Sequence, residues 1–575
     1  MTSIPLVAAP EKSRSAPVSW RKRKELLQDV WKLALPVILT NLLQSLVDTI
    51  DVFMVGRLGP IAIAAVGMSS AIRMLVLVML LSVAAGAMTM IAQAKGARDP
   101  ERMSFVTRQA VSSGVLISLA LTVLGLLLAR PLLALVNSGG EPEAVELGVS
   151  YLRILFLGTP FLVLNIVFNR LMQGAGDTVT PLILTGALNV LNVLLNFVLM
   201  FGMGPIPALG VAGAALGTVI ARGIGVAIVF FLFYAGKHEV KILPGSYRPN
   251  WQMFNDIFTI GVPSGVQGLF RNGSRLLVLG IITSTEVGTY GAAALAIGFQ
   301  VETLVFMPGL ALNVAATSLV GQALGSWQTD EARLRGNTAI ALGLMVMTVL
   351  ALPIIVFAPA IIRLFDPSSH PVLLATGTTY FRINTVVLPL SALAMVANGA
   401  LRGAGDSVPG LISTMVTRAL IAASLAWVLA FPVGMGSLGV WIALAVGVVL
   451  EAIYMVWRWR GDTWLKVALG KTVLYRTHLR HLPDAMRQRY LSEVRGPLMA
   501  QPGTRELVDA GGVVYAQADA EIRLAFEGGG WVTKHDSLFP SSDFCLPPLH
   551  HICPVAAAGK RPLSMLSGCQ ESKPN

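Results

Sequence analysis

Apolar runs long enough to cross a membrane recur along most of this 575-residue chain. A helix needs about 20 mostly apolar residues to span the hydrocarbon core of a bilayer. Lipid admits only helices or closed barrels, because every backbone polar group must be satisfied internally. The runs therefore predict an all-α integral membrane protein with twelve transmembrane helices. These helices are expected near residues 30–56, 61–92, 104–130, 149–172, 179–203, 208–235, 252–283, 290–322, 335–364, 373–399, 408–432 and 436–458.

The charge distribution supports a membrane protein and gives it an orientation. Only 13% of the residues are charged, which is too few for a soluble surface. The formal net charge of +12 is spread over loops and termini, so a nucleic-acid patch is not indicated. Basic residues gather in alternate loops, such as 95–102, 237–248 and 458–466. By the positive-inside rule, both termini are expected in the cytoplasm.

The two halves of the chain repeat each other. Residues 172–179 read MQGAGDTV and residues 401–408 read LRGAGDSV, at an offset of 229 residues. The same offset pairs further identical residues: Gln93 with Gln322, Tyr151 with Tyr380, Pro160 with Pro389, and Asn169 with Asn398. Each half is thus predicted to be a six-helix unit. Because six is even, both units begin on the same side of the membrane and form a parallel repeat.

The repeat divides the chain into five parts. We expect a cytoplasmic arm over 1–29, a first lobe over 30–235, a cytoplasmic linker over 236–251, a second lobe over 252–460 and a cytoplasmic tail over 461–575. The two GAGD loops are interpreted as tight helix–helix turns. Glycine tolerates positive φ there, and the aspartate can cap the next helix.

A polar stripe marks the first predicted helix. Asn41, Gln44, Asp48 and Asp51 fall within about 80° of one another on one helical face. A carboxylate inside a span is costly, by roughly 2.5–3.5 kcal/mol on insertion scales. Amides can serve as hydrogen-bonding contacts between helices. The two aspartates instead indicate a proton or cation site.

Other intramembrane polar residues break the repeat. At an offset of 227 residues, Asp48 falls on Arg275, so the acidic stripe belongs to the first half. The second half instead carries Arg271, Arg275, Glu302 and Arg418, which either pair with one another or line a substrate cavity. In the fifth span, Asn192 and Asn196 lie one turn apart. They can coordinate a cation, share a proton network with Asp51, or hold helices together.

The predicted tail contains no span. It includes Cys545, His550, His551 and Cys553, but the spacing CLPPLHHIC matches no structural zinc pattern, and no metal site is predicted. We expect a disordered or weakly folded extension.

Several motifs together resemble the MATE (multidrug and toxic compound extrusion) family. They include VDTIDVFMVGRLGPIAIAAVG after Pro36, the two GAGD loops, MPGLALNVAATSLVGQALG at 307–325 and LGVAGAALGT. The resemblance covers about residues 25–460 and is closer to the prokaryotic DinF-type branch than to the NorM-type branch. It implies two six-helix lobes in the V-shaped arrangement of the MOP superfamily. It also implies a monomer in the cytoplasmic (inner) membrane that exports cationic amphiphilic compounds in exchange for protons or sodium ions, with no other cofactor.

The resemblance also implies residue roles. Asp51, Asn192, Asn196 and Thr218 would form the ion-coupling site, and Pro36 would bend the first helix. Several family members have a carboxylate at the position of Asn196, so Asp48 would have to supply any second acid. Asn41, Gln44, Arg271 and Glu302 are candidates for the substrate cavity.

The sequence leaves other functions open. A lipid or lipid-linked sugar flippase of the same superfamily is the main alternative. Fourteen spans and a strongly basic central cavity would favour it, whereas this sequence has twelve predicted spans and few intramembrane arginines. A channel is less compatible with two-lobed repeats. No catalytic residues are predicted, because the seven histidines lie in loops or the tail rather than clustered at a membrane face. Protons and sodium ions both remain possible coupling ions.

Overall fold

The computed structural model describes residues 19–136, 141–236, 238–326, 328–366, 370–461 and 463–470, and five strands between residues 474 and 535. The side chains of residues 74–82, 136, 466, 469 and 470 and of the strands lie outside the described set. The chain divides into two compact units. One is Val18–Trp464, and the other combines Met1–Pro17 with Leu465–Asn575.

The first half of the larger unit is a bundle of six helical segments. They are α1 (Trp20–Gly56), α2 (Pro60–Gly96), α3 (Pro100–Val136), the pair α4 (Pro142–Leu157) and α5 (Thr159–Gly174), α6 (Val179–Phe201) and α7 (Gly210–Tyr234). The pair α4 and α5 bends by 52° at Gly158, next to Pro160. Pro160 stands at the start of α5 and lacks the N–H that would continue the helical ladder from α4, which accounts for the break.

The second half repeats this arrangement. Its segments are α8 (Trp251–Thr283), α9 (Gly288–Gly325), α10 (Thr329–Val356) with the short α11 (Ala358–Phe365), the pair α12 (Pro371–Val386) and α13 (Leu388–Gly403), the run α14 (Val408–Ser413), η1 (Thr414–Ala422) and α15 (Ala423–Ala430), and α16 (Gly436–Arg460). The pair α12 and α13 bends by 46° next to Pro389, which corresponds to Pro160 in the first half. The segment η1 is a π-helix.

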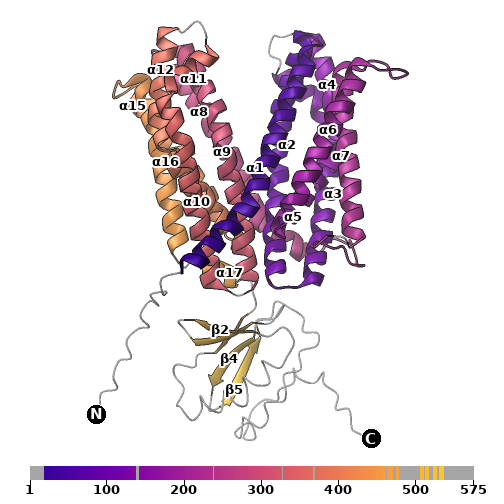
Figure 1. The fold of residues 1–575 in the computed structure, drawn as a ribbon, viewed down its shortest axis with the longest axis vertical. Coiled ribbons are helices and arrows are strands. Elements are labelled where there is room, and N and C mark those ends of the chain that lie inside the picture. The colour runs from indigo at the N-terminus through magenta and orange to yellow at the C-terminus, as the bar shows by residue number, and fades with distance from the viewer. Residues whose placement is uncertain are drawn as a thin grey trace. The chain divides into compact units, whose positions relative to one another are not determined.

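Figure 1 shows that the two bundles of this unit meet at one end and diverge toward the other. Eight described helices are long and apolar enough to cross a membrane, and the two bent pairs bring the number to ten. Two further helices, α2 and α8, complete the bundles. The predicted all-α membrane architecture of two six-helix lobes is confirmed. We call the two bundles the N-lobe and the C-lobe, and the end where they meet the contact end.

The first helix begins earlier than predicted. We placed residues 1–29 in an arm outside the first lobe, but α1 starts at Trp20. The side chain of Ser19 accepts a hydrogen bond from the backbone N–H of Lys22 at 3.3 Å and so caps the helix. Apolarity locates only the part of a helix that faces lipid, so it misses a polar turn that continues the same helix into water.

The contact end is built from a reciprocal pair of interactions. Gln93 Nε2 of α2 donates to the carbonyl oxygen of Gly403, and Gln322 Nε2 of α9 donates to that of Gly174, each at 3.1 Å. The two donors and the two acceptors are both related by the 229-residue repeat. A Cβ atom on Gly96 would lie 1.9 Å from the carbonyl oxygen of Gln322. The backbones of α2 and α9 therefore approach closely, and we call these contacts the crossed clasp.

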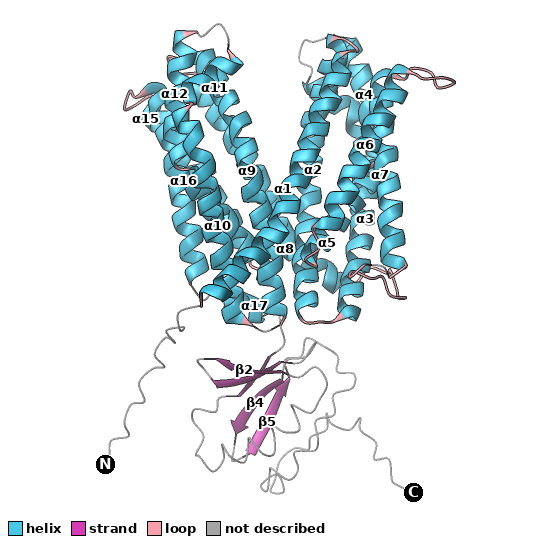
Figure 2. Ribbon diagram, viewed as in Figure 1, coloured by secondary structure: helices cyan, strands magenta, loops and turns pink. Residues whose placement is uncertain are grey.

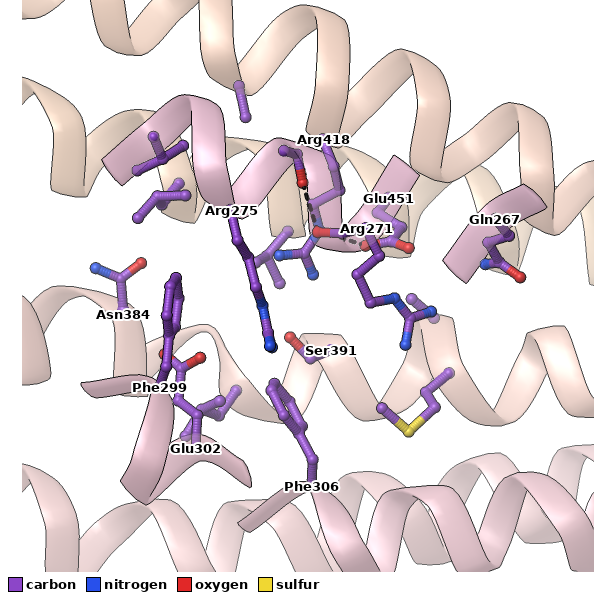
Figure 3. Close-up of a pocket in the computed structure, with 18 of the residues that line it drawn as sticks. Gln267, Arg271, Arg275, Phe299, Glu302, Phe306, Asn384, Ser391, Arg418 and Glu451 are labelled. Carbon is purple, nitrogen blue, oxygen red and sulfur yellow. Dashed lines mark hydrogen bonds and ion pairs between the residues drawn. The ribbon is translucent and has the colours of Figure 1, made fainter. Parts of the chain in front are cut away.

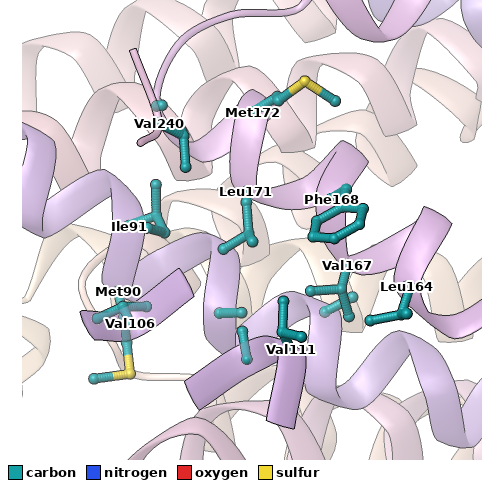
Figure 4. Close-up of a cluster of buried hydrophobic side chains, with 14 of the residues drawn as sticks. Met90, Ile91, Val106, Val111, Leu164, Val167, Phe168, Leu171, Met172 and Val240 are labelled. Carbon is teal, nitrogen blue, oxygen red and sulfur yellow. The ribbon is translucent and has the colours of Figure 1, made fainter. Parts of the chain in front are cut away.

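The N-lobe core lies where α2, α3 and α5 meet (Figure 4). Phe168 is fully buried and makes edge contacts with Phe230 and Phe233, at centroid distances of 5.0 and 5.4 Å. Lipid tails are as apolar as these side chains, so close packing rather than removal from water holds the bundle together. This packing fixes the rotation of each helix and therefore determines which polar side chains face the interior.

The GAGD loops are tight turns, as we interpreted them. Gly176 and Gly405 have φ values of +88° and +84°, which only glycine adopts readily. Asp177 Oδ1 accepts hydrogen bonds from the backbone N–H groups of Val179 and Thr180, at 3.0 and 2.9 Å. The aspartate thus caps the first turn of α6.

The smaller unit contains strands where we expected disorder or weak folding. Five strands form one sheet in the order β2-β3-β1-β4-β5. Figure 2 draws the strands in magenta and labels β2, β4 and β5. They are β1 (Leu474–Thr477), β2 (Arg505–Asp509), β3 (Gly512–Ala516), β4 (Ile522–Glu527) and β5 (Gly530–His535). The pair β1 and β4 is parallel and the other pairs are antiparallel. Strands such as GVVYA and GWVTKH are rich in β-branched and aromatic residues, which favour extended structure. The predicted cysteine and histidine cluster at 545–553 lies outside the described residues.

Candidate functional site

Four of the predicted ion-coupling residues come together between α1, α6 and α7. Asn196 Nδ2 donates to Asp51 Oδ1 at 2.8 Å, which joins α6 to α1. The same Nδ2 lies 3.4 Å from Asn192 Oδ1, and Asn192 Nδ2 donates to Thr218 Oγ1 at 3.2 Å. Thr218 in turn donates to the carbonyl oxygen of Ala214 at 2.9 Å. These contacts form one continuous network, which we call the N-lobe polar cluster.

The centre of this cluster holds a buried acceptor that is not used. Asn196 is 1% exposed, and its Oδ1 has no hydrogen-bond partner among the described residues. A Cβ atom on Gly217 would lie 2.2 Å from this oxygen, so α7 needs a glycine at that position. An unpaired buried acceptor is costly. The site can therefore take a proton donor or a cation at this atom.

The rest of the polar stripe lies outside the cluster. Asp48 and Gln44 are exposed, and Gln44 Nε2 donates to Asp48 Oδ1 at 3.3 Å, while Asn41 is half-buried. Asp48 remains within electrostatic range of Asp51. Pro36 lies inside α1, and Thr40 Oγ1 donates to its carbonyl oxygen at 2.8 Å. The helix runs on through Pro36, so the hinge remains a prediction.

Two arginines near the cluster were missed. Arg73 on α2 and Arg222 on α7 lie within electrostatic range of Asp51, and Arg222 also lies within range of Asp48. Both fall inside predicted spans, so the reasoning that singled out the aspartates could also have found them. With them, the surroundings of the two aspartates carry both signs of charge.

The C-lobe holds a separate cavity of about 100 Å³, shown in Figure 3. Arg418 Nε of η1 contacts Glu451 Oε2 of α16 at 2.7 Å, and Thr414 donates to the other oxygen of Glu451 at 3.3 Å. Glu302 Oε1 accepts a hydrogen bond from the Tyr380 hydroxyl at 2.5 Å. The sequence left open whether these charged residues pair with one another. Arg418 does form an ion pair, but with Glu451, a buried carboxylate within a predicted span that we did not single out.

The GAGD turns differ between the lobes in their ionic partners. In the N-lobe, Asp177 Oδ2 lies 2.7 Å from His238 Nε2 in the linker. In the C-lobe, the equivalent Asp406 pairs with Arg458 at 3.0 Å. Partial burial raises the pKa of Asp177, but hydrogen bonds from His238 and Thr180 outweigh it and bring the pKa to about 2. Asp177 is therefore a carboxylate at neutral pH.

Comparison with known proteins identifies the class to which this fold belongs. The sequence profile of the MatE family matches residues 36–198 and again 263–428, which are the two halves of the repeat. The structure also matches solved membrane transporters of the MOP superfamily. One is an outward-facing multidrug resistance MATE family transporter, with a TM-score of 0.70 and 24% identity, covering 78% of this chain and 97% of that one. Another is a MOP superfamily transporter from Pyrococcus furiosus, with a TM-score of 0.69 and 24% identity, covering 77% and 96%.

Sequence relatives agree with this class. A probable multidrug resistance protein NorM of Rhodopseudomonas palustris is 31% identical over 470 residues, covering 78% of this chain and 93% of that protein. A protein of the same description from Thermotoga maritima is 28% identical over 460 residues, covering 80% and 96%. This chain belongs to the MATE family. It is a multi-pass membrane protein of a transporter family, and the assignment to the DinF-type branch stays a prediction.

Proposed function

We propose that this protein is a secondary active multidrug exporter that exchanges cationic amphiphilic compounds for protons. The observation that carries the proposal is the contact between Asp51 and Asn196, which places a carboxylate of α1 against a buried amide whose oxygen is free. The descriptions of the NorM relatives support multidrug export. The two-lobed repeat supports alternating access.

Asp51 is the residue that would carry the proton. As a carboxylate it accepts the N–H of Asn196. Once protonated it becomes a donor and needs an acceptor. Rotation of the Asn196 amide would offer Oδ1, the atom without a partner in the described structure. Protonation would thus reverse the direction of this hydrogen bond and remove a negative charge that a cationic substrate can use.

The change at Asp51 would reach the rest of the lobe through α1. Pro36 has no N–H to continue the helical ladder, so α1 is weakest near that residue. We propose that α1 bends there when Asp51 is protonated, which narrows the N-lobe and expels the substrate. Release of the proton on the other side would restore the carboxylate and the straight helix.

The orientation proposed for the protein rests on its basic loops. Lys95, Arg98 and Arg102 lie at the contact end, where α2 ends and α3 begins. We propose that this end faces the cytoplasm, with both termini, in the inner membrane. The crossed clasp would then close the cytoplasmic side while the lobes are apart on the other. The protein would act as a monomer, since each lobe pairs with the other lobe of the same chain.

Transport by purified protein in sealed vesicles tests the coupling ion. In proteoliposomes loaded with a cationic dye, an inward proton gradient in sodium-free buffer should drive efflux. Sodium is the rival ion, because Asp51, Asn192, Asn196 and Thr218 all offer oxygen atoms. They supply only one carboxylate, however, and a sodium site favours more negative charge. Efflux that requires a sodium gradient and ignores the proton gradient would refute proton coupling and make Asn196 an ion ligand.

The flippase alternative is less well supported. Fourteen spans would favour it, whereas the described residues form six segments in each lobe. A strongly basic central cavity would also favour it, and the described basic cavity lies within the C-lobe. Reconstituted protein that moves a labelled lipid across the bilayer, without moving the dye, would support this alternative.

A further inference from the structure

The first helices of the two lobes carry opposite charges at equivalent positions. At an offset of 227 residues, Gln44 corresponds to Arg271 and Asp48 to Arg275. Arg271 and Arg275 are one turn apart on α8 and line the C-lobe cavity. We propose that this cavity binds the anionic group of an amphiphile, a carboxylate, sulfonate or phosphate, between Arg271 and Arg275. The inference is independent of the coupling ion and of export.

The charges of the cavity are not balanced without such a group. Arg418 is paired with Glu451, and Glu302 is bound by the hydroxyl of Tyr380. Among the described residues, neither Arg271 nor Arg275 forms an ion pair, and each is only within electrostatic range of a carboxylate, Arg271 of Glu451 and Arg275 of Glu302. Three guanidinium groups therefore face two carboxylates, and one carboxylate already has a neutral partner. Unpaired charge within a span is costly, so an anion here would gain affinity from charges that the protein already holds in place.

The two arginines are presented in a way that suits an anion. The Arg275 guanidinium lies over the ring of Phe299, 4.7 Å from its centroid. The ring attracts the positive charge, and the guanidinium keeps five N–H donors in one plane that can bind an anion. In Figure 3, Arg271 and Arg275 extend from α8 into the same space. A planar, always-charged donor is well matched to carboxylate, sulfonate or phosphate oxygens.

The other residues that line the cavity indicate what the uncharged part of the ligand must be. Phe299, Phe306 and Leu388 add apolar surface to the cavity beside the charged groups. The volume of about 100 Å³ has room for a headgroup or a small ring but not for a whole drug. The π-helix η1 places Arg418 beside this space, and such segments occur frequently at functional sites. The site thus fits one anionic group attached to an apolar body.

Binding to the purified full-length chain tests the inference without any ion gradient. Calorimetry in a neutral detergent should show saturable binding of phenylacetate and much weaker binding of the uncharged phenylacetamide, which has the same single ring. Arg271→Gln and Arg275→Gln should each weaken binding of the acid by about tenfold or more, the loss of one charge-assisted hydrogen bond. The amide should be unaffected. Arg363→Gln, which removes an exposed arginine of α11, is the matched control and should change neither.

A second arm distinguishes a soluble anion from a lipid headgroup. The same titration in nanodiscs of phosphatidylcholine, with and without phosphatidylglycerol, measures competition. Competition that disappears in Arg275→Gln assigns the anionic group to a lipid phosphate, and binding without competition assigns it to a soluble amphiphile. Equal affinity of the wild-type chain for acid and amide, or no saturable binding of the acid in either setting, overturns the inference. The comparison of acid and amide binding to the wild-type chain tests the inference even if a variant does not fold.

Discussion

The N-lobe and the C-lobe share a scaffold but differ at the polar groups it carries. The crossed clasp uses the same residue types on both sides, Gln93 with Gly403 and Gln322 with Gly174. The stripe on the first helix of each lobe instead changes from Gln44 and Asp48 to Arg271 and Arg275. The crossed clasp, which obeys the repeat, holds the two lobes together, whereas the charged residues that break it lie on the first helix of each lobe and, in the C-lobe, line a cavity. The comparison thus distinguishes residues that maintain the fold from residues that are candidates for function.

The fifth segment of each lobe has a different backbone conformation, and this difference accompanies the change in polar side chains. In the N-lobe, α6 is a regular helix that directs Asn192 and Asn196 toward α1 and α7. In the C-lobe, the equivalent stretch becomes the π-helix η1, with Arg418 at its centre. A π-helix inserts an extra residue per turn and rotates the helical turns after it. It aims Arg418 at Glu451, a pairing that the N-lobe does not have among its described residues.

The largest expected effect distinguishes the carboxylates of the two lobes. Asp51→Asn should reduce coupled export of a cationic dye to background, because an amide cannot take up and release a proton. Glu302→Gln should leave most of this export, since Glu302 serves the C-lobe cavity. Dye efflux from proteoliposomes with equal amounts of each variant measures both. Full activity of Asp51→Asn, or equal loss in both variants, would contradict the assignment of coupling to the N-lobe carboxylate alone.

Equivalent substitutions on the two sides of the crossed clasp should have equal effects on its stability and on transport. A methyl group on Gly96 or on Gly325 would lie 1.9 Å from a carbonyl oxygen of the facing helix. Gly96→Ala and Gly325→Ala should each destabilise the closed contact end by about 1–3 kcal/mol and reduce transport severalfold. Gly67→Ala, also on α2, is the control, because a Cβ there has no neighbour within 4 Å.

Labelling of single cysteines placed at the contact end would measure the effect on its closure. Both clasp variants should become more accessible, whereas Gly67→Ala should not. Accessibility that rises for one clasp variant alone would show that the two sides of the clasp are not equivalent.

A smaller effect concerns stability in acid. The pKa of Asp177 is about 2, below its usual value near 3.8, so its charge stabilises the fold above about pH 4. That contribution is lost as the pH falls toward 2. Asp177→Asn should lower the free energy of unfolding by about 1–2 kcal/mol at neutral pH and flatten this acid dependence. Asp177→Ala should cost about 1 kcal/mol more, because alanine cannot cap α6.

Denaturant unfolding monitored by tryptophan fluorescence, repeated from neutral pH to pH about 2, would give these values. A wild-type curve that stays level between pH about 4 and about 2, or matches that of Asp177→Asn, would contradict the role given to the charge.

The sequence predicted the spans, the repeat and three members of the N-lobe polar cluster, and the family resemblance added the fourth, Thr218. Periodicity and repeat offsets place residues on helix faces, which sufficed for Asp51 and Asn196. The same reasoning could not pair Arg418 with Glu451 or Tyr380 with Glu302. Such pairs join different helices, and their formation depends on helix rotation and on the π-helix, which are set by packing. The strands of the tail were missed because short β segments there were outweighed by polar, proline-rich surroundings.

The smallest expected effect comes from removing the tail. Leu465 begins the second compact unit, and none of the described residues beyond it belongs to a span or has a repeat partner. We expect a chain that ends at Trp464 to keep wild-type dye efflux. A chain that ends at Gly461 should lose on the order of 3 kcal/mol of stability. Trp464 is fully buried, stacks on Trp459 at 4.6 Å and donates to its carbonyl oxygen at 2.8 Å. Thermal unfolding and efflux of both truncations measure the difference, and loss of efflux in the longer one at normal membrane levels would show that the tail takes part in transport.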